Sequence, residues 1–424
     1  MAKLQLSNSN IQDINVLNFT RSGLIILLMI LILNMRPAIM GQLFGAIYSG
    51  LLVTLIAIIA FWKRKIYLKK GRLKYIAAAV MMAMYVFFQI LFVGFSSFSG
   101  AIATLAYIFI GVLIILIIDR DKARNFSKVL IGICVLFGIS YLITYINFLV
   151  FGNSYTVYII NLPTHTDYVY ELEILFPFSP VYNGTANIAG LKMPRAIGMM
   201  REPGLYQMVL IIAYWLQDLY KFRYNIFIKF ILIFSLIITF STAGYALLLG
   251  TIMWKMFKNL GQNRLKYLIG GIPVVLILFY VLIFSESQFG IIEKFDSQSG
   301  ASRLGATIVS LELIKENPLF GIGFHLNPNN VEIGINYLGT IAQLGIIGSL
   351  IFLMPIFYTW LKIKDGPIQV VNIFIVLVLT MLLAQPIYDK PLTFLFLSML
   401  LVIGVKTKKD LFFKNKVLIK RHAA

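Results

Sequence analysis

The sequence predicts an all-α protein that crosses a membrane many times. Of its 424 residues, 59% are hydrophobic and only 13% are charged, and the mean hydropathy is +0.87. Apolar segments recur along the chain at the length a bilayer core requires, about 20 residues. Lysines and arginines are concentrated in alternate connections between these segments, which is the distribution that orients membrane proteins.

Twelve segments are predicted to span the membrane, with both termini in the cytoplasm. They are residues 22–35, 38–62, 74–95, 99–118, 127–151, 204–220, 225–241, 243–257, 267–284, 335–361, 368–386 and 389–405. The first, seventh and eighth are short for a full crossing.

The predicted orientation separates the cations sharply. Segments assigned to the cytoplasm hold 29 of the 37 Lys and Arg residues. The segments assigned to the outside hold the other eight: Arg36, Lys192, Arg195, Arg201, Lys294, Arg303, Lys315 and Lys390. Three of these eight, Arg195, Arg201 and Arg303, are arginines within short motifs and are the first candidates for functional residues.

Composition excludes several classes of protein. The net charge of +20 would suggest nucleic-acid binding in a soluble protein, but here the cations lie in short loops that face an anionic leaflet. The single cysteine, Cys134, excludes an intramolecular disulfide and a cysteine-based metal site. Residues 21–35 run directly into a second span, so we expect an anchor rather than a cleaved signal peptide.

Two long connections are predicted on the outside of a single integral membrane domain over residues 1–424. The first, 152–203, is rich in Tyr, Pro and Asn, which suits either sugar stacking or an aromatic belt at the membrane surface. The second, 285–334, contains a predicted helix over 303–316. A basic tail, 406–424, is predicted in the cytoplasm.

The predicted helix over 303–316 is amphipathic. Leu304, Ile308 and Leu311 recur at helical spacing on one face, and Asn317-Pro318 ends the helix. It is too short and too charged to span a bilayer. We expect it to lie on the membrane surface or to pack over a cavity.

The first motif is P-R-A-I-G-M-M-R-E-P-G, residues 194–204, where the first long loop enters the sixth span. Pro203 suits the first turn of a helix, which places Arg201 and Glu202 at a helix N-terminus. Such a terminus beside an arginine can bind an anion, especially a diphosphate. The alternative is that Arg201 pairs with Glu202 or reaches toward lipid headgroups.

Two further motifs follow. The sequence S-T-A-G, residues 241–244, lies between two short spans, where small residues favour close packing of helices. Arg303 is expected to open the surface helix, and N-P-L-F-G-I-G-F-H, residues 317–325, comes after it. Residues 336–338, N-Y-L, then precede Q-L-G-I-I-G, residues 343–348. The glycines allow sharp turns and close approach of backbones.

Taken in order, these motifs resemble the O-antigen ligase/polymerase superfamily. The resemblance rests on R-x5-R-E-P-G, S-T-x-G and the series S-R, N-P-L-F-G-I-G-F, N-Y-L and Q-L-G-I-I-G, and it covers about residues 195–350. Within the superfamily the nearest match is the Wzy-type polysaccharide polymerases of capsule and O-antigen pathways. The resemblance implies a GT-C-like membrane glycosyltransferase whose donor is linked to undecaprenyl or another polyprenyl diphosphate.

The resemblance also implies which residues hold the substrate. Outside-facing arginines of the superfamily bind the polyprenyl diphosphate, and the matching positions here are Arg195, Arg201 and Arg303. We expect Arg201 and Arg303 to stabilise the departing diphosphate, and Asn336 and Tyr337 to contact the substrate.

One departure from the superfamily pattern bears on the catalytic base. The ligase branch carries a histidine shortly before the aromatic-Leu pair of the third motif, whereas this chain reads G-I-N-Y-L at residues 334–338. The departure favours a polymerase over a ligase. It leaves the identity of the catalytic base undecided: His325, Glu202 and Asp389 are candidates by their chemistry.

The sequence therefore predicts a polysaccharide polymerase of the bacterial cytoplasmic membrane, acting on a lipid-linked oligosaccharide. The expected partners are the bilayer and a chain-length-regulating co-polymerase, without nucleic acid. Because no His/Asp/Glu cluster of metal-ligand spacing occurs on the predicted outer face, we expect no metal or other cofactor. The alternatives are an O-antigen ligase and a flippase or transporter; the last is disfavoured because charges are scarce within the predicted spans.

Overall fold

The structure, a computed structural model, describes residues 38–39, 55, 70–94, 98–152, 155–162, 170–188, 191–258, 273, 298–323, 337–383 and 387–404. Helices occupy nine of the twelve predicted spans there. The predicted spans 22–35, 38–62 and 267–284 lie outside the described residues, apart from isolated positions.

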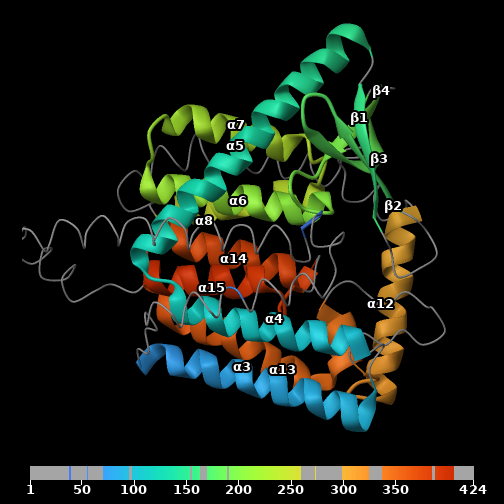
Figure 1. Cartoon of the computed structure of the whole chain (residues 1–424), viewed down its shortest axis with the longest axis vertical. Coiled ribbons are helices and arrows are strands. Elements are labelled where there is room, and N and C mark those ends of the chain that lie inside the picture. The colour runs from blue at the N-terminus through green and yellow to red at the C-terminus, as the bar shows by residue number, and fades with distance from the viewer. Residues whose placement is uncertain are drawn as a thin grey trace, which may run out of the picture.

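The helices are α3 (Lys70–Phe88) with its π-helical continuation η1 (Gln89–Val93), α4 (Phe98–Ile117), α5 (Arg120–Phe151), α6 (Pro203–Tyr220), α7 (Asn225–Ile237), α8 (Thr242–Lys258), α12 (Gln298–Glu316), α13 (Tyr337–Ile363), α14 (Ile368–Leu383) and α15 (Pro391–Gly404). Apart from α12, they form a bundle (Figure 1). Its buried apolar core includes side chains from α4, α5, α6, α14 and α15.

Several of the helices have the length and composition of membrane spans. Among the described residues, three are long and apolar enough to cross a bilayer: Arg72–Val93, Arg120–Phe151 and Tyr337–Ile363. Four shorter apolar helices accompany them. The protein is thus mostly helical, as a multi-pass membrane protein would be, while the number of twelve spans stays a prediction.

The prediction of an all-α fold is wrong for part of the first long loop. Four antiparallel strands form one sheet in the order β1 (Thr156–Leu162), β2 (Tyr170–Leu175), β3 (Ser179–Ile188) and β4 (Leu191–Ala196). The physical reason lies in the alternation of side chains along β2, where Leu172 and Ile174 are buried and Glu173 between them is not. Alternation with a period of two buries one face of a strand.

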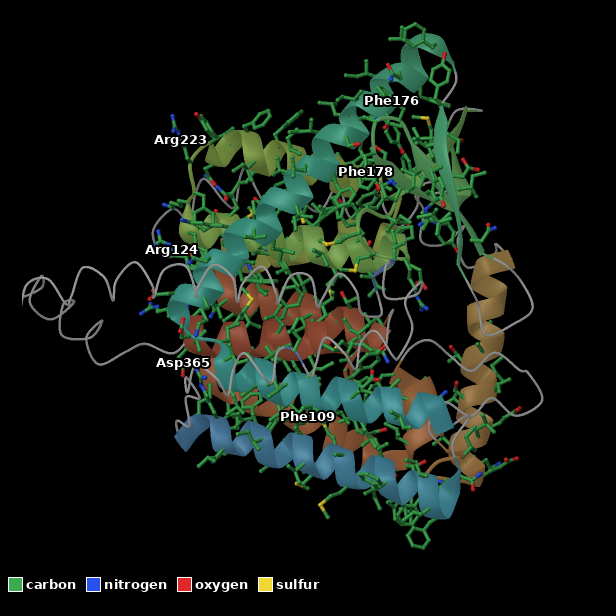
Figure 2. All side chains as sticks on the ribbon, in the orientation of Figure 1. Phe109, Arg124, Phe176, Phe178, Arg223 and Asp365 are labelled. Atoms are coloured by element: carbon green, nitrogen blue, oxygen red, sulfur yellow. The ribbon has the colours of Figure 1, made fainter. Side chains whose placement is uncertain are left out.

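The two ends of the bundle differ in character. Arg124, Arg223 and Asp365 lie at one end, whereas Phe176 and Phe178, beside the sheet, lie toward the other (Figure 2). We call these the cation-rich end and the sheet end. This segregation matches the alternation of cations along the sequence.

A buried carboxylate ties four helices together at the cation-rich end. Asp218 of α6 accepts from Lys229 Nζ of α7 at 2.5 Å and from Lys255 Nζ of α8 at 2.7 Å. Gln369 of α14 donates to the same carboxylate at 3.0 Å. Two cations on one partly buried carboxylate fix the relative positions of these helix ends.

Helix α12 lies across the sheet end of the bundle, roughly perpendicular to the bundle helices (Figure 1). It begins at Gln298, five residues before the predicted start. The prediction that Arg303 opens this helix is therefore wrong, because position 303 lies in its second turn. The small residues Ala306 and Ser310 are buried, and this close packing stabilises turns that Ser and Gly alone would not.

Candidate functional site

The first motif forms a turn between the sheet and α6. Strand β4 ends at Ala196, and α6 begins with Pro203 at its first position. Between them, the hydroxyl of Tyr141 on α5 accepts hydrogen bonds from the amides of Ile197 at 3.2 Å and Gly198 at 2.8 Å. Gly198 has φ +54°, and a Cβ there would lie 2.2 Å from the Tyr206 ring. Only glycine fits this turn.

Arg201 and Glu202 sit directly before α6, as the position of Pro203 predicts. Glu202 is the N-cap residue, but its side chain does not cap the helix. Arg201 Nε lies 2.9 Å from Glu202 Oε1, with the two side chains 40% and 30% exposed. This contact is an ion pair rather than a hydrogen bond, because Nε has no hydrogen-bond partner of good geometry among the described residues. The pair can open toward a stronger anion.

Arg195 is held more tightly than Arg201. From β4 it donates to the carbonyl of Thr239 through Nε at 3.2 Å and to that of Phe240 through a terminal nitrogen at 3.3 Å. Its guanidinium also lies 5.7 Å from the ring centroid of Tyr182, its cross-strand partner. Arg195 thereby connects the first motif to the turn that leads into the S-T-A-G motif.

The S-T-A-G motif packs against α6. It begins α8, and Ser241 and Thr242 are buried. A Cβ at Gly244 would lie 2.3 Å from Oε1 of Gln207, so glycine permits the contact between α8 and α6. Both polar atoms of that buried amide are without a hydrogen-bond partner in the described part of the chain. The expected packing role of the motif agrees with this contact.

The third motif joins α12 to α13 through their backbones. Helix α13 is broken at Gly345, where φ is +66°. Residues 318–323 lie against this break, with Ile322 N donating to Ala342 O at 3.0 Å and Ile346 N donating to Pro318 O at 2.9 Å. A Cβ at Gly345 would lie 2.2 Å from Leu319 O, and one at Gly321 would lie 2.4 Å from Gln343 O. These glycines let two chain segments interlock.

The remaining site residues are less fully placed. Tyr337 donates to Ser349 O at 2.9 Å across the break in α13. The backbone of Arg303 is described within α12, and helical periodicity puts position 303 on the face shared by Ala306 and Ser310. His325 and Asn336 lie outside the described residues. Their roles, like that of Arg303, stay predictions.

The two described candidates for the catalytic base differ in access. Asp389 precedes α15 at the sheet end; its side chain is 2% exposed and pairs with Lys390 at 2.6 Å. Glu202 is partly exposed and adjoins Arg201. Of the two, Glu202 is the one that a substrate can reach without rearrangement of the bundle.

The sequence did not predict two side chains that hold the motifs in position. Tyr141 holds the first motif, as above. Gln89, in the π-helical turn after α3, donates to Phe320 O of the third motif at 2.8 Å and to the Tyr85 hydroxyl at 3.0 Å. A polar side chain within an apolar span is costly unless it has such a partner, and that cost was the signal in the sequence.

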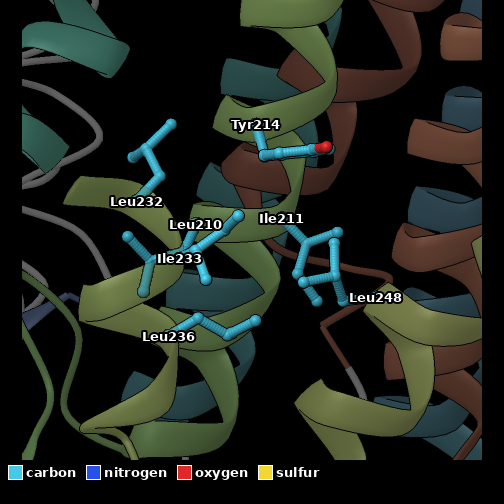
Figure 3. A pocket seen from close by; sticks show the side chains of 7 residues that line it. All are labelled: Leu210, Ile211, Tyr214, Leu232, Ile233, Leu236 and Leu248. Carbon is cyan, nitrogen blue, oxygen red and sulfur yellow. The ribbon is translucent and has the colours of Figure 1, made fainter. Parts of the chain in front are cut away.

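A narrow apolar crevice with almost no enclosed space lies between α6, α7 and α8. Figure 3 shows its lining, which includes Leu210, Tyr214, Leu236 and Leu248. Pockets that enclose a drug-sized ligand are larger, about 300–1,000 Å³. The crevice is thus too small to enclose a polyprenyl chain.

Comparison with known proteins finds a family model that is similar to part of the chain. Residues 227–353 match the model of a family described as O-antigen ligase. The match spans α7, α8, α12 and much of α13 and contains the second and third motifs. The match supports the resemblance to the O-antigen ligase/polymerase superfamily that the second and third motifs predict, whereas the first motif, residues 194–204, lies outside it. No curated protein matches the chain, and no solved structure does.

Proposed function

We propose that this protein polymerises oligosaccharide repeat units carried on a polyprenyl diphosphate, at the sheet end of the bundle. The observation that carries the proposal is the Arg201–Glu202 pair, which is partly exposed at the N-terminus of α6. It stands at the end opposite the bulk of the cations, where positive charge is scarce in the sequence. A guanidinium beside a helix N-terminus attracts a diphosphate through charge and through oriented N–H groups.

The chemistry follows from that position. The acceptor hydroxyl oxygen forms a bond to the anomeric carbon of the donor sugar, and the bond from that carbon to the diphosphate oxygen breaks. The electron pair leaves with the polyprenyl diphosphate, whose added charge Arg201 and Arg303 stabilise. Glu202 accepts the hydrogen bond of the attacking hydroxyl and orients it, and its carboxylate can take the proton.

The three arginines contribute in different ways. Arg195 already donates to two backbone carbonyls, so its main effect is to hold the motif turn against the α7–α8 turn. Arg201 has a side chain that is 40% exposed and is paired with a carboxylate. By helical periodicity, position 303 lies on the same side of α12 as buried Ala306 and Ser310. The apolar crevice between α6, α7 and α8 is too small to enclose the lipid tail.

Product analysis with purified protein tests the proposal. A polymerase given only a lipid-diphosphate oligosaccharide makes a ladder of longer chains and releases polyprenyl diphosphate. The second candidate, a ligase, is favoured by the description of the matching family and would transfer the glycan once, only when a separate acceptor is added. A transporter would give neither product, and that outcome overturns both enzymatic candidates.

A further inference from the structure

Helix α12 divides its surface into three sectors. Ala306 and Ser310 face the bundle and are buried. At about 100° per residue, Leu304, Ile308 and Leu311 form a second sector, and they are 58%, 49% and 50% exposed. Exposed Glu312 and Glu316 form a third sector. The acidic sector is centred roughly 90° from the apolar one, so the two do not overlap.

The apolar sector continues a surface that faces lipid. The chain leaves α12 through exposed Leu319 and Phe320, and the Phe320 ring lies 5.2 Å from that of Phe88 on α3. Beside it, Leu91 and Phe92 are more than 70% exposed at the end of a membrane-spanning candidate. An apolar surface therefore runs from this span to α12, where exposed Lys315 lies in the apolar sector at its C-terminal end and can extend its ammonium toward the headgroups.

An exposed apolar surface also runs between α13 and the segment that leaves α12. Ile347 of α13 donates its amide to Leu319 O at 3.2 Å, and Ile346, Ile347 and Leu350 are exposed on this second membrane-spanning candidate. A soluble surface seldom leaves so many large apolar side chains exposed together.

From these three sectors we propose that α12 rests on the acyl chains of the leaflet at the sheet end. The occupant of the Leu304–Ile308–Leu311 face is lipid, and the Glu312–Glu316 face contacts water. A helix at the rim of a bundle meets protein, lipid and water on three successive sides, as α12 does. The bilayer then fixes how deep α12 lies at the membrane surface. It thereby also fixes the depth of the bundle-facing side of this helix, which includes position 303. The proposal does not depend on the function proposed above.

Spin-label accessibility tests this placement. Single cysteines replace Ile308, Leu311, Glu312 or Glu316 in a Cys134→Ala background, and each receives a nitroxide. The full chain is reconstituted in phosphatidylethanolamine–phosphatidylglycerol vesicles. Collision rates with apolar oxygen and with a water-soluble nickel chelate are compared. Leu350→Cys, on the exposed face of α13, is the lipid reference, and Arg223→Cys is the water reference.

We expect labels at 308 and 311 to resemble the label at 350, with oxygen collisions several times more frequent than nickel collisions. Labels at 312 and 316 should resemble the label at 223. Frequent nickel collisions at 308 and 311 would place this face in water and overturn the proposal. Immobile labels that neither reagent reaches would show a second copy or another protein on the face, which overturns it equally. Leu304→Cys replaces the variant at 308 or 311 if either fails to reconstitute.

Discussion

At the scale of single residues, Arg201 differs from Arg195, the other arginine of the first motif, because its partner is the carboxylate of Glu202 and not the backbone. Its pair with Glu202 is partly exposed, whereas Arg195 donates to two carbonyls. An incoming diphosphate can therefore replace the partner of Arg201 without disturbing the fold, while loss of Arg195 removes support from two turns at once.

Replacement of Arg201 by lysine should reduce polymer synthesis by about tenfold or more, because a charged hydrogen bond contributes about 1.5–3 kcal/mol and an ammonium lacks the bidentate fork. Polymer length and amount are measured in cells at matched protein levels. Arg223→Lys, at the cation-rich end, is the control and should be neutral. Near-normal synthesis by Arg201→Ala would sink the assignment.

Gly345 allows α13 to break, and residues 318–323 of the third motif pack against this break. Gly345→Ala should destabilise the protein by about 1–3 kcal/mol or more, because a side chain at φ +66° is strained and its Cβ would meet the backbone of Leu319. Thermal unfolding in detergent measures the loss. Gly250→Ala is the matched control, since nothing lies within 4 Å of a Cβ there and alanine suits a helix. Equal melting temperatures for the two variants would contradict the interlock.

At the scale of elements, α5 supports the sheet and the first motif together. The Tyr141 hydroxyl accepts from the amides of Ile197 and Gly198 and donates to Pro180 O. Ser140 and Thr144, on the same side of α5, form hydrogen bonds with the hydroxyl of Ser179 at the start of β3. The placement of Arg201 thus depends on a helix sixty residues earlier in the sequence.

Tyr141→Phe should lower stability by about 1–3 kcal/mol, since it leaves buried amides unpaired, and it should reduce activity by loosening the turn before Arg201. The readouts are thermal unfolding and polymer synthesis. Tyr158→Phe, on exposed β1, tests whether the loss of any tyrosine hydroxyl matters. If Tyr141→Phe matches the wild type in both readouts, the turn is held by other contacts.

The sequence predicted the helices well because long apolar runs leave few alternatives in a bilayer. It did not reveal the sheet, because the short alternation around Leu172 and Ile174 lies within a loop rich in Tyr and Pro. It also missed the break at Gly345, since apolar residues continue on both sides of that glycine. The start of α12 was placed too late because its first turn has no apolar pattern, although Ser297, directly before Gln298, is a residue type that favours the N-cap position.

Some features of the candidate site could be predicted from local sequence, whereas others depend on contacts between distant segments. Pro203 marks a helix start locally, so the position of Arg201 and Glu202 followed from neighbouring residues. The carbonyl partners of Arg195 come from residues 239 and 240, and no local pattern relates such distant segments. Burial of Asp389 likewise depends on how α15 packs in the bundle, which its own sequence does not specify.

At the scale of the whole molecule, the segregation of charge predicts a fixed orientation in the membrane. Single cysteines replace Tyr158 or Glu316 at the sheet end, or Arg223 at the cation-rich end, in a Cys134→Ala background. An impermeant maleimide should label the cysteines at 158 and 316 on intact cells. It should label the cysteine at 223 only after lysis. The reverse pattern would place the proposed site in the cytoplasm.

The central claim is that arginines at the sheet end stabilise a departing polyprenyl diphosphate during glycosyl transfer. Elongation of a lipid-diphosphate oligosaccharide by purified Arg201→Ala, Arg303→Ala and double variants, with and without a chelator, tests it most directly. We predict that each single variant loses most elongation, that the double variant loses little more because the two act as a unit, and that chelation leaves the wild type active. Full activity of Arg201→Ala and Arg303→Ala, or loss of wild-type activity on chelation, would contradict the claim.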